Sequence, residues 1–219
     1  MASNDEIKFI AVEGVIGAGK TALAKKLKSR LESKLILEQF EANPFLENFY
    51  NDRKRFAFQT QMFFLINRFK QQEELNQDDL FTNFIVCDYI FDKDKIFAYL
   101  NLSAEELKLY ENVFPLLSRN LRKPDLVIYL QSSLDRLMFN IKKRGRSIER
   151  NLTRSYIEEL SDAYNHFFFR YNSTPLLIVN STDIDFVNND EDFDELFRQI
   201  FREDRGVTEY FKPEARSIG

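Results

Sequence analysis

Residues 14–21 read GVIGAGKT and follow the apolar run IKFIAV at residues 7–12, with the acidic Glu13 between them. This is the spacing of a phosphate-binding loop: a glycine, four residues, then glycine, lysine and threonine. The backbone N–H groups of such a loop face phosphate oxygens, and bulky side chains would obstruct that approach. Lys20 is expected to reach the β and γ phosphates of a nucleotide, and the Thr21 hydroxyl to bind Mg²⁺. A plain glycine turn would not explain Lys20 and Thr21 at the start of a helix. The stretch therefore predicts a nucleotide site.

The composition is typical of a globular protein and excludes several classes. The chain has 219 residues, 44% of them apolar and 30% charged, enough for one sizeable core, and a single domain over residues 1–219 is expected. No segment has the roughly 18 consecutive apolar residues of a membrane span, and the start MASNDEIK carries no secretory pattern. A net charge of -4 argues against broad attraction to nucleic acid or anionic membranes. With Cys87 as the only cysteine, a cytoplasmic location is expected.

Apolar runs alternate with amphipathic segments along the chain. The runs predict five strands, near residues 7–12, 34–40, 84–88, 125–130 and 175–180. Helices are predicted between and after them, near residues 20–33, 44–50, 53–76, 103–121, 134–145 and 192–202. Strands joined by helical crossovers indicate an α/β fold with a parallel sheet and helices on both faces. Residues 205–219 lack a core pattern and are predicted to be a loose tail.

Acidic residues follow two of the predicted strands. Asp88 ends the run FIVCD, at the sheet edge where ligands of parallel sheets bind, and suits Mg²⁺ coordination; capping the next turn is the alternative. Glu38 ends the second strand, and a carboxylate there can take a proton from an alcohol acceptor, a role that Glu41 could also fill. The strings Asp-x-x-Gly and Asn-Lys-x-Asp are absent, and Tyr89 follows Asp88 where motor ATPases usually carry Glu. These features favour a small-molecule kinase over a nucleotide switch or a motor.

The segment KKRGRSIER at residues 142–150 places Arg144, Arg146 and Arg150 around Gly145. A basic, flexible segment can close over a transferring phosphoryl group and spread its charge. Read alone, it fits a solvated turn equally well. Beside a phosphate-binding loop it predicts a lid over about residues 144–152.

An ordered set of motifs, from about Phe9 to Phe201, resembles the deoxyribonucleoside kinases, particularly a bacterial deoxyadenosine and deoxyguanosine kinase branch. The motifs are FIAVEGVIGAGKT, LEQFEANPFLENFY, AFQTQMFF, CDYIFDKDKIFA, RGRSIER, YIEELSDAYNHFFF and TDIDF. The resemblance implies a P-loop kinase fold with a five-stranded parallel sheet, a homodimer formed through a helical face, and ATP-dependent phosphorylation of a sugar 5′-hydroxyl. Deoxyadenosine is the favoured acceptor, with ATP and Mg²⁺ on the donor side.

The same resemblance assigns roles to individual residues. Glu38 is similar to the family's base for the 5′-hydroxyl, Asp88 to the acid of its Glu/Asp-Arg-Ser signature, and Gln59 to the amide that bonds the nucleobase. Tyr50 and Glu149 resemble the pair that holds the 3′-hydroxyl. The expected catalytic residues are Lys20, Glu38 and Arg144. The expected ATP site consists of Gly14, Val15, Ile16, Gly17, Ala18, Gly19, Lys20, Thr21, Arg144, Arg146, Asp185 and Phe186.

Two departures from the family pattern concern charge. Tyr89 and Ile90 stand where the signature carries Arg and Ser, and either Lys93 or Lys95 could replace the missing cation. An arginine seven positions after the nucleobase-reading Gln would fall on Ile66, whereas Arg68 lies two positions further on.

Two other functions fit the loop. A nucleoside monophosphate kinase, such as a thymidylate kinase, would need a basic cluster for the acceptor phosphate; Arg53, Lys54 and Arg55 are available but are expected to be solvated. A nucleotide-binding regulatory module would need no acceptor pocket. Release of ADP with and without nucleosides separates these alternatives.

Overall fold

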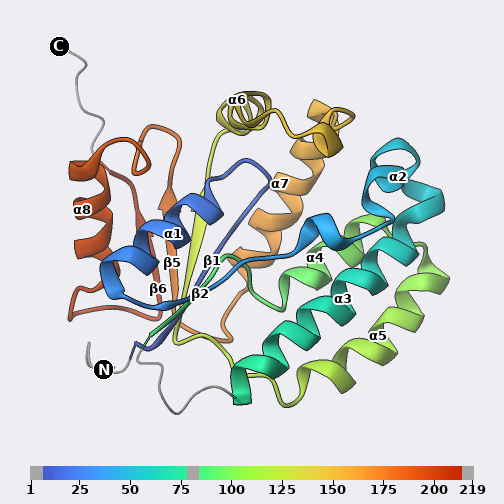
Figure 1. The fold of residues 1–219 in the computed structure, drawn as a ribbon, viewed down its shortest axis with the longest axis horizontal. Helices are drawn as coiled ribbons and strands as arrows, with labels where there is room; N and C mark the ends of the chain where they lie inside the picture. Colours follow the sequence, from blue (N-terminus) through green and yellow to red (C-terminus); the bar gives the residue numbers. More distant parts are fainter. Residues whose placement is uncertain (1–6, 78–83, 214–219) are drawn as a thin grey trace.

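The structure, a computed structural model, describes residues 7–77 and 84–213, and its centre is a parallel β-sheet with helices on both faces (Figure 1). The sheet order is β2-β3-β1-β4-β5-β6, and every pairing is parallel. The strands are β1 (Phe9–Gly14), β2 (Lys34–Ile36), β3 (Ile85–Cys87), β4 (Leu126–Gln131), β5 (Leu176–Asn180) and β6 (Thr208–Phe211). The predicted α/β fold with a parallel sheet is confirmed.

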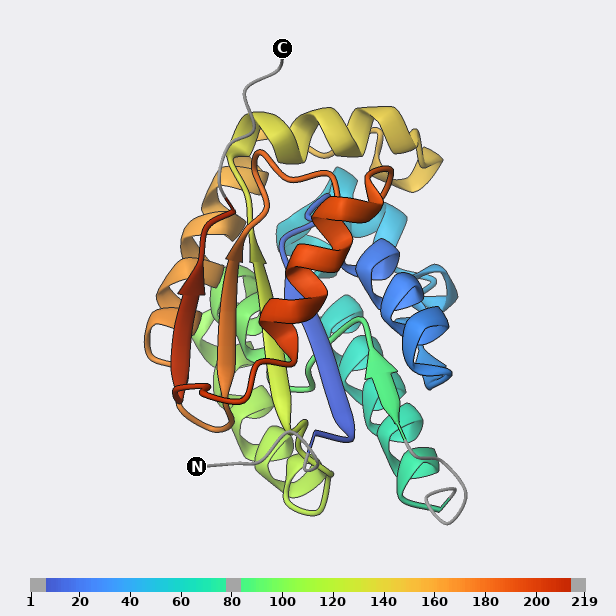
Figure 2. The same ribbon diagram turned by 90° about the vertical axis from the view of Figure 1, so that its left-hand side faces the viewer.

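The helices cover the sheet in two layers, with α1 and α8 on one face and α3, α4, α5 and α7 on the other (Figures 1 and 2). Helix α3 matches the long helix predicted from residue 53, and α5 begins with the Ser103–Glu106 capping box. The helices are α1 (Lys20–Leu31), α2 (Leu46–Asn51), α3 (Arg53–Gln77), α4 (Lys93–Asn101), α5 (Ala104–Ser118), α6 (Leu134–Arg144), α7 (Arg154–Phe169) and α8 (Asp190–Ile200), with short 3₁₀ turns at Phe40–Ala42 and Ser147–Glu149.

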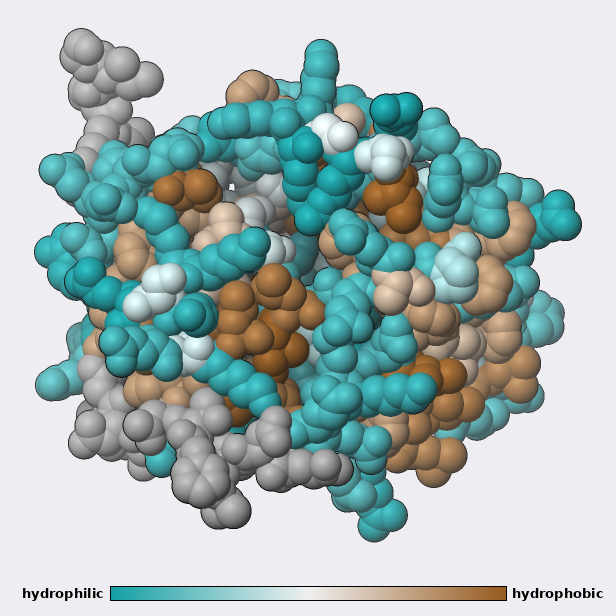
Figure 3. Space-filling view, viewed as in Figure 1, coloured by the Kyte–Doolittle hydropathy of each residue, from teal (hydrophilic) through white to brown (hydrophobic). Residues whose placement is uncertain are grey.

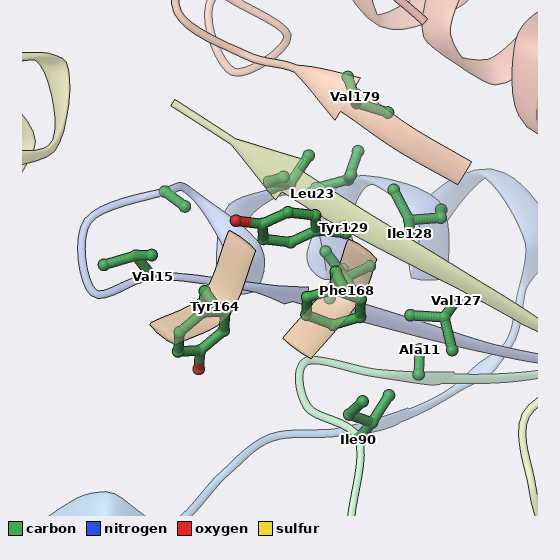
Figure 4. Close-up of a cluster of buried hydrophobic side chains, with 14 of the residues drawn as sticks. Ala11, Val15, Leu23, Ile90, Val127, Ile128, Tyr129, Tyr164, Phe168 and Val179 are labelled. Atoms are coloured by element: carbon green, nitrogen blue, oxygen red, sulfur yellow. The ribbon is translucent and has the colours of Figure 1, made fainter. Parts of the chain in front are cut away.

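The core lies around the central strands. All six residues of β1 are buried, as expected for a strand covered on both faces. On the α7 side, the rings of Tyr129 and Phe168 stack with centroids 4.2 Å apart, and Tyr164 lies next to them (Figure 4). This aromatic packing fixes α7 against β4, beside the strand that leads into the glycine loop.

The sheet has a sixth strand in the segment predicted to be a loose tail. Residues Thr208–Phe211 pair with β5, and Arg202 Nη2 donates to Glu209 Oε1 at 2.5 Å. The strand is short, lies at the sheet edge and is only half-buried, so its sequence carries no strong apolar alternation. The prediction of a loose tail is therefore wrong for these four residues, while residues 214–219 lie outside the described residues.

The strand order places the site. The chain passes from β1 to β2 across β3, so β1 and β3 are neighbours whose helical connections leave in different directions. Ligands of open parallel sheets bind at the carboxyl ends of the strands beside such a point. The glycine loop follows β1, Asp88 follows β3 and Glu38 follows β2, so all three lie at this edge.

Candidate active site

The glycine loop has a backbone that only glycine adopts easily. Gly17 and Gly19 have φ of 90° and 95°, in the left-handed region. A Cβ on Gly17 would lie 2.7 Å from the carbonyl oxygen of Leu137, and the Asn140 side chain on the same helix donates to the Gly17 carbonyl at 2.8 Å. Helix α6 therefore braces the loop at close range.

Lys20 begins α1 and folds back over the loop. Its Nζ donates to the carbonyl oxygens of Gly14 at 2.7 Å and Val15 at 3.2 Å. Burial, and then the nearby Lys93 ammonium, lower the pKa of Lys20 to about 8, so it remains mostly protonated at neutral pH. A cation in this position can exchange the two carbonyls for phosphate oxygens of a nucleotide.

Thr21 and Asp88 form the contact expected of a Mg²⁺ site. The Thr21 hydroxyl donates to Asp88 Oδ2 at 2.6 Å, and Asp88 Oδ1 accepts the backbone N–H of Glu38 at 2.7 Å. Both carboxylate oxygens thus face the site, which does not favour the turn-capping alternative. Within residues 7–77 and 84–213 no three His, Cys, Asp or Glu side chains converge as metal ligands. The pair therefore fits a Mg²⁺ that takes its other ligands from phosphate and water.

A cavity of about 240 Å³ opens beside the loop. It lies between α1, α2, α3, α4 and the predicted lid. The structure brings many of the predicted site residues to its wall: Ile16, Lys20, Thr21, Glu38, Tyr50, Asp88, Arg144, Arg146 and Glu149.

Glu38 projects into this cavity, whereas Glu41 is exposed. Its Oε1 accepts from Arg68 Nε at 2.8 Å and Nη2 at 2.5 Å, and its Oε2 accepts from Lys93 Nζ at 2.9 Å. Burial disfavours the ionised form, but Lys93 and Arg68 outweigh it and hold the pKa of Glu38 well below its ordinary value. Of the two candidate carboxylates, Glu38 is the one with access to an acceptor.

The structure moves the predicted nucleobase-reading amide two positions along the chain, from Gln59 to Gln61. Gln59 is exposed and does not line the cavity, whereas Gln61 is buried in its wall. Two positions along a helix correspond to a rotation of roughly 200°, so the two side chains point to opposite sides of α3. The arginine expected seven positions on then falls on Arg68, which is 3% exposed, instead of Ile66, which is 43% exposed.

Arg68 belongs to a buried polar cluster that the motifs did not single out. Its Nη1 bonds Asp94 Oδ2, and Gln61 Nε2 donates to the Asp94 carbonyl at 2.8 Å and to its carboxylate. Asp94 is fully buried; burial raises its pKa, although Arg68 and Gln61 oppose this. In sequence Asp94 lies in DKDK, which resembles a solvated charge run. Of this cluster, Gln61 and Arg68 line one end of the cavity.

The predicted lid closes the other end. Arg144 Nη2 donates to both carboxylate oxygens of Glu149, at 2.6 and 2.7 Å, and Arg146 Nη1 lies 3.5 Å from Glu149 Oε1. Tyr50, on α2, shares this wall; burial, followed by Tyr156 and Glu149, raises its pKa well above the ordinary value. The expected sugar-reading pair and lid arginines are thus in one place.

Asp185 and Phe186 lie beside the glycine loop. Phe186 is buried, and a Cβ on Gly19 would be 3.1 Å from its Cζ. The Asp185 carboxylate accepts from the Asn188 side chain at 2.9 and 3.1 Å. Neither residue lines the cavity, so their contact with the donor's adenine stays a prediction.

Tyr89, which stands where the family signature has Arg, and the two lysines that could replace that cation lie in different places. Tyr89 turns away from the cavity and donates through its hydroxyl to Gln71 Oε1 at 3.2 Å. Lys95 lies outside the cavity and pairs with Asp92 at 2.7 Å, whereas Lys93 is buried in the cavity wall. Of the two lysines that could replace the missing cation, Lys93 is therefore the one at the cavity.

The basic cluster required by the rival monophosphate kinase is not at the cavity. Arg53, Lys54 and Arg55 do not line it. Arg53 instead pairs with Glu159 at 3.1 Å and lies over the Tyr156 ring. Arg53, Lys54 and Arg55 therefore give no support to the rival function.

A braced phosphate-binding loop, a threonine–aspartate pair and a carboxylate in an enclosed acceptor cavity define a P-loop kinase. The model of the deoxynucleoside kinase family matches residues 10–203, and the chain belongs to that family. A deoxyguanosine kinase of Bacillus subtilis is 38% identical over 197 residues, covering 88% of this chain and 95% of the relative. A deoxyadenosine/deoxycytidine kinase of the same organism is 32% identical, covering 88% and 91%.

Solved structures agree in fold. Deoxyadenosine kinase from M. mycoides with bound dATP superimposes with a TM-score of 0.76 at 25% identity, covering 88% of this chain and 98% of that one. The same enzyme with bound dCTP gives a TM-score of 0.75 at 26% identity. Among the described residues, no helix is both long and apolar enough to span a membrane.

Proposed function

We propose that the protein transfers the γ-phosphoryl group of ATP to the 5′-hydroxyl of a deoxyribonucleoside, with purine deoxynucleosides preferred, as a step of nucleotide salvage. The observation that carries this proposal is the position of Glu38, which shares one cavity with Lys20 and Thr21 of the phosphate-binding loop. An acceptor bound there has a carboxylate on one side and the donor phosphates on the other.

On the donor side, the loop N–H groups and Lys20 bind the β and γ phosphates. Mg²⁺ would be held by Thr21 and Asp88, and when bound it would neutralise charge on the phosphate oxygens. Arg144 and Arg146 supply further positive charge from the lid, provided that Arg144 exchanges Glu149 for phosphate. These residues stabilise the charge that shifts between donor and acceptor.

On the acceptor side, Glu38 orients the 5′-hydroxyl and receives its proton. The 5′-oxygen forms the new bond to the γ phosphorus while the bond from that phosphorus to the bridging oxygen of ADP breaks, and ADP keeps the electron pair. Because Lys93 and Arg68 keep the carboxylate ionised, Glu38 is ready to accept a hydrogen bond as soon as the acceptor enters.

The nucleobase end is lined by Gln61 and Arg68, and Asp94, which bonds both side chains, is fully buried and does not line the cavity. Arginine can donate two bonds to O6 and N7 of guanine, and glutamine can pair with N6 and N7 of adenine. This set suits purines. The preference for deoxyadenosine expected through Gln59 loses that support, because Gln59 is exposed, and deoxyguanosine fits the cluster equally well.

The sugar is read by Tyr50 and Glu149, which line the same wall. If they share the 3′-hydroxyl, acceptor binding releases Arg144 from Glu149 toward the phosphates, so acceptor and donor are sensed together. A 3′-deoxy acceptor should then cost the parent heavily in kcat/KM and cost a Tyr50→Phe, Glu149→Gln double variant far less. Equal losses in the two enzymes would show that these residues do not read the 3′-hydroxyl.

We also propose a cytoplasmic homodimer that binds neither nucleic acid nor membrane. The homodimer is supported by large exposed apolar side chains on the helical layer, among them Tyr99 on α4, Leu116 on α5 and Phe169 on α7. Figure 3 shows hydrophobic side chains gathered at the lower right of one face, in the region of α5. Sedimentation velocity tests the assembly: a monomer at micromolar concentration would contradict it.

The function is tested by ADP release from ATP and Mg²⁺ with each of the four deoxynucleosides in turn. A purine deoxynucleoside should stimulate release most, and Arg53→Ala should leave it unchanged because Arg53 lies outside the cavity. Stimulation by a deoxynucleoside monophosphate alone would favour the rival kinase. Release that no acceptor changes would favour a regulatory module.

A further inference from the structure

Lys93 is the first residue of α4, and its side chain is only 4% exposed. A lysine is almost never this buried unless its charge is compensated. Its Nζ donates to Glu38 Oε2 at 2.9 Å and lies 3.9 Å from Glu13 Oε1. Burial lowers the pKa of Lys93, but Glu13 and Glu38 outweigh it and raise the pKa, so the ammonium is charged.

Glu13 does not depend on Lys93 for its hydrogen bonds. This fully buried carboxylate accepts the backbone N–H of Gly14 at 2.9 Å, the N–H of Ile90 at 3.1 Å and the Tyr164 hydroxyl at 3.1 Å. Glu13 therefore acts on Lys93 mainly through its charge. Within residues 7–77 and 84–213, Glu38 is the one carboxylate to which Lys93 donates a hydrogen bond.

The ammonium also faces the reaction space. Lys93 lines the acceptor cavity together with Lys20, and the two cations are close enough that Lys93 lowers the pKa of Lys20. Lys20 belongs to the phosphate-binding loop, whereas Lys93 is bonded to Glu38. The path of a phosphoryl group from donor to acceptor thus starts beside one lysine and ends beside the other.

We propose that Lys93 is a catalytic residue, which contacts the transferred phosphoryl group on the acceptor side and exchanges Glu38 for the product phosphate. As the new bond to the 5′-oxygen forms, the hydroxyl proton passes to Glu38, which becomes neutral and bonds Lys93 less strongly. The product 5′-phosphate carries the negative charge instead, and the ammonium bonds its oxygens. This proposal rests on the proposed transfer to a 5′-hydroxyl.

Lys95 provides a matched control. It lies two residues along the same helix, pairs with Asp92 and has a side chain that is 37% exposed outside the cavity. Lys93→Met should lower kcat by roughly 10²–10³, the usual effect of removing one donor that stabilises charge in the transition state. Lys93→Arg should recover at least part of this loss, and Lys95→Met should behave as the parent.

A binding experiment separates a catalytic role from a structural one. Isothermal titration measures the affinities for deoxyguanosine and for its 5′-monophosphate, both without ATP. Lys93→Met should lower the affinity for the monophosphate at least about tenfold, the effect of 1.4 kcal/mol. The affinity for the nucleoside should be nearly unchanged. A residue that only holds α4 in place would weaken both ligands equally. Equal weakening, or a kcat within a few-fold of the parent, overturns the proposal.

Because Lys93→Met removes one of the two cations that compensate the largely buried Glu38 and leaves only Arg68, the variant could lose its cooperative thermal transition. In that case the Glu38→Gln variant is compared with the Glu38→Gln, Lys93→Met double variant, in which both charges of the pair are gone. The double variant should bind the monophosphate more weakly than Glu38→Gln does, and an equal affinity overturns the proposal. A parent that phosphorylates no deoxynucleoside would instead refute the proposed function itself.

Discussion

Arg68→Met removes the one side chain that joins the nucleobase end of the cavity to Glu38. Arg68 is 3% exposed and contacts Asp94, which is fully buried. Removing one partner of a buried ion pair typically costs about 3–5 kcal/mol, because the remaining charge is uncompensated. In an Arg68→Met, Asp94→Asn double variant both charges are gone, so most of that loss should be recovered.

The same substitution should relax the choice of acceptor. A bidentate contact to a base discriminates by about 1–3 kcal/mol, which is roughly a 5- to 150-fold ratio of kcat/KM. We therefore expect the kcat/KM for deoxyguanosine divided by that for thymidine to decrease by a factor in this range in the double variant. Urea unfolding measures the stability of each variant, and steady-state kinetics with the two nucleosides measures the selectivity. A double variant that is stable yet keeps the parent ratio within twofold would refute a base-reading role for Arg68.

Three further predictions follow from single positions. Lys20→Ala should abolish transfer, because the loop backbone alone does not neutralise the β and γ phosphates; turnover within tenfold of the parent in an ADP-release assay would contradict this. Glu38→Gln should lower kcat by roughly 10²–10⁴, whereas the exposed Glu41→Gln should not; the reverse order would show that the wrong carboxylate was chosen. Gly17→Ala should destabilise the fold and weaken ATP binding, since its Cβ would lie 2.7 Å from the Leu137 carbonyl; an unchanged melting temperature would contradict the clash.

The Glu38 substitution also has a pH signature. The cations around Glu38 lower its pKa in the folded protein from the ordinary 4.5, so its charge adds stability that is full above pH 4.5 and is lost as the pH falls further. The difference in unfolding free energy between the parent and Glu38→Gln should therefore narrow below pH 4.5. Urea titrations at successive pH values measure this difference; a gap that widens on acidification would mean that Glu38 is not held ionised in the folded state.

The parts of the site that could be predicted from sequence are those with short, fixed spacing. The loop at residues 14–21, Asp88 at a strand end and the arginines around Gly145 each have chemistry that follows from local pattern, and the parallel sheet brings them to one edge. Glu38 could be narrowed only to one of two carboxylates, because the chain leaves β2 irregularly and its burial depends on the tertiary fold.

The remaining parts depend on rotation and packing that no local pattern determines. Gln59 and Gln61 have the same side chain, and only the orientation of α3 decides that Gln61 faces the cavity. Asp94 and Lys93 lie in a charged string that is typical of a surface, yet α4 buries both of them. The edge strand β6 pairs through its backbone, for which its half-exposed side chains give little signal.

Single-turnover reaction of the protein with γ-labelled ATP, Mg²⁺ and deoxyguanosine tests the central claim most directly, with the labelled product identified by phosphorus NMR. The cavity that joins Glu38 to the phosphate-binding loop predicts that the label appears on the 5′-oxygen, as a phosphorus resonance coupled to the 5′ protons, and that Glu38→Gln slows its appearance without abolishing ATP binding. Label found in inorganic phosphate, or transferred only when a deoxynucleoside monophosphate is supplied, would contradict the account.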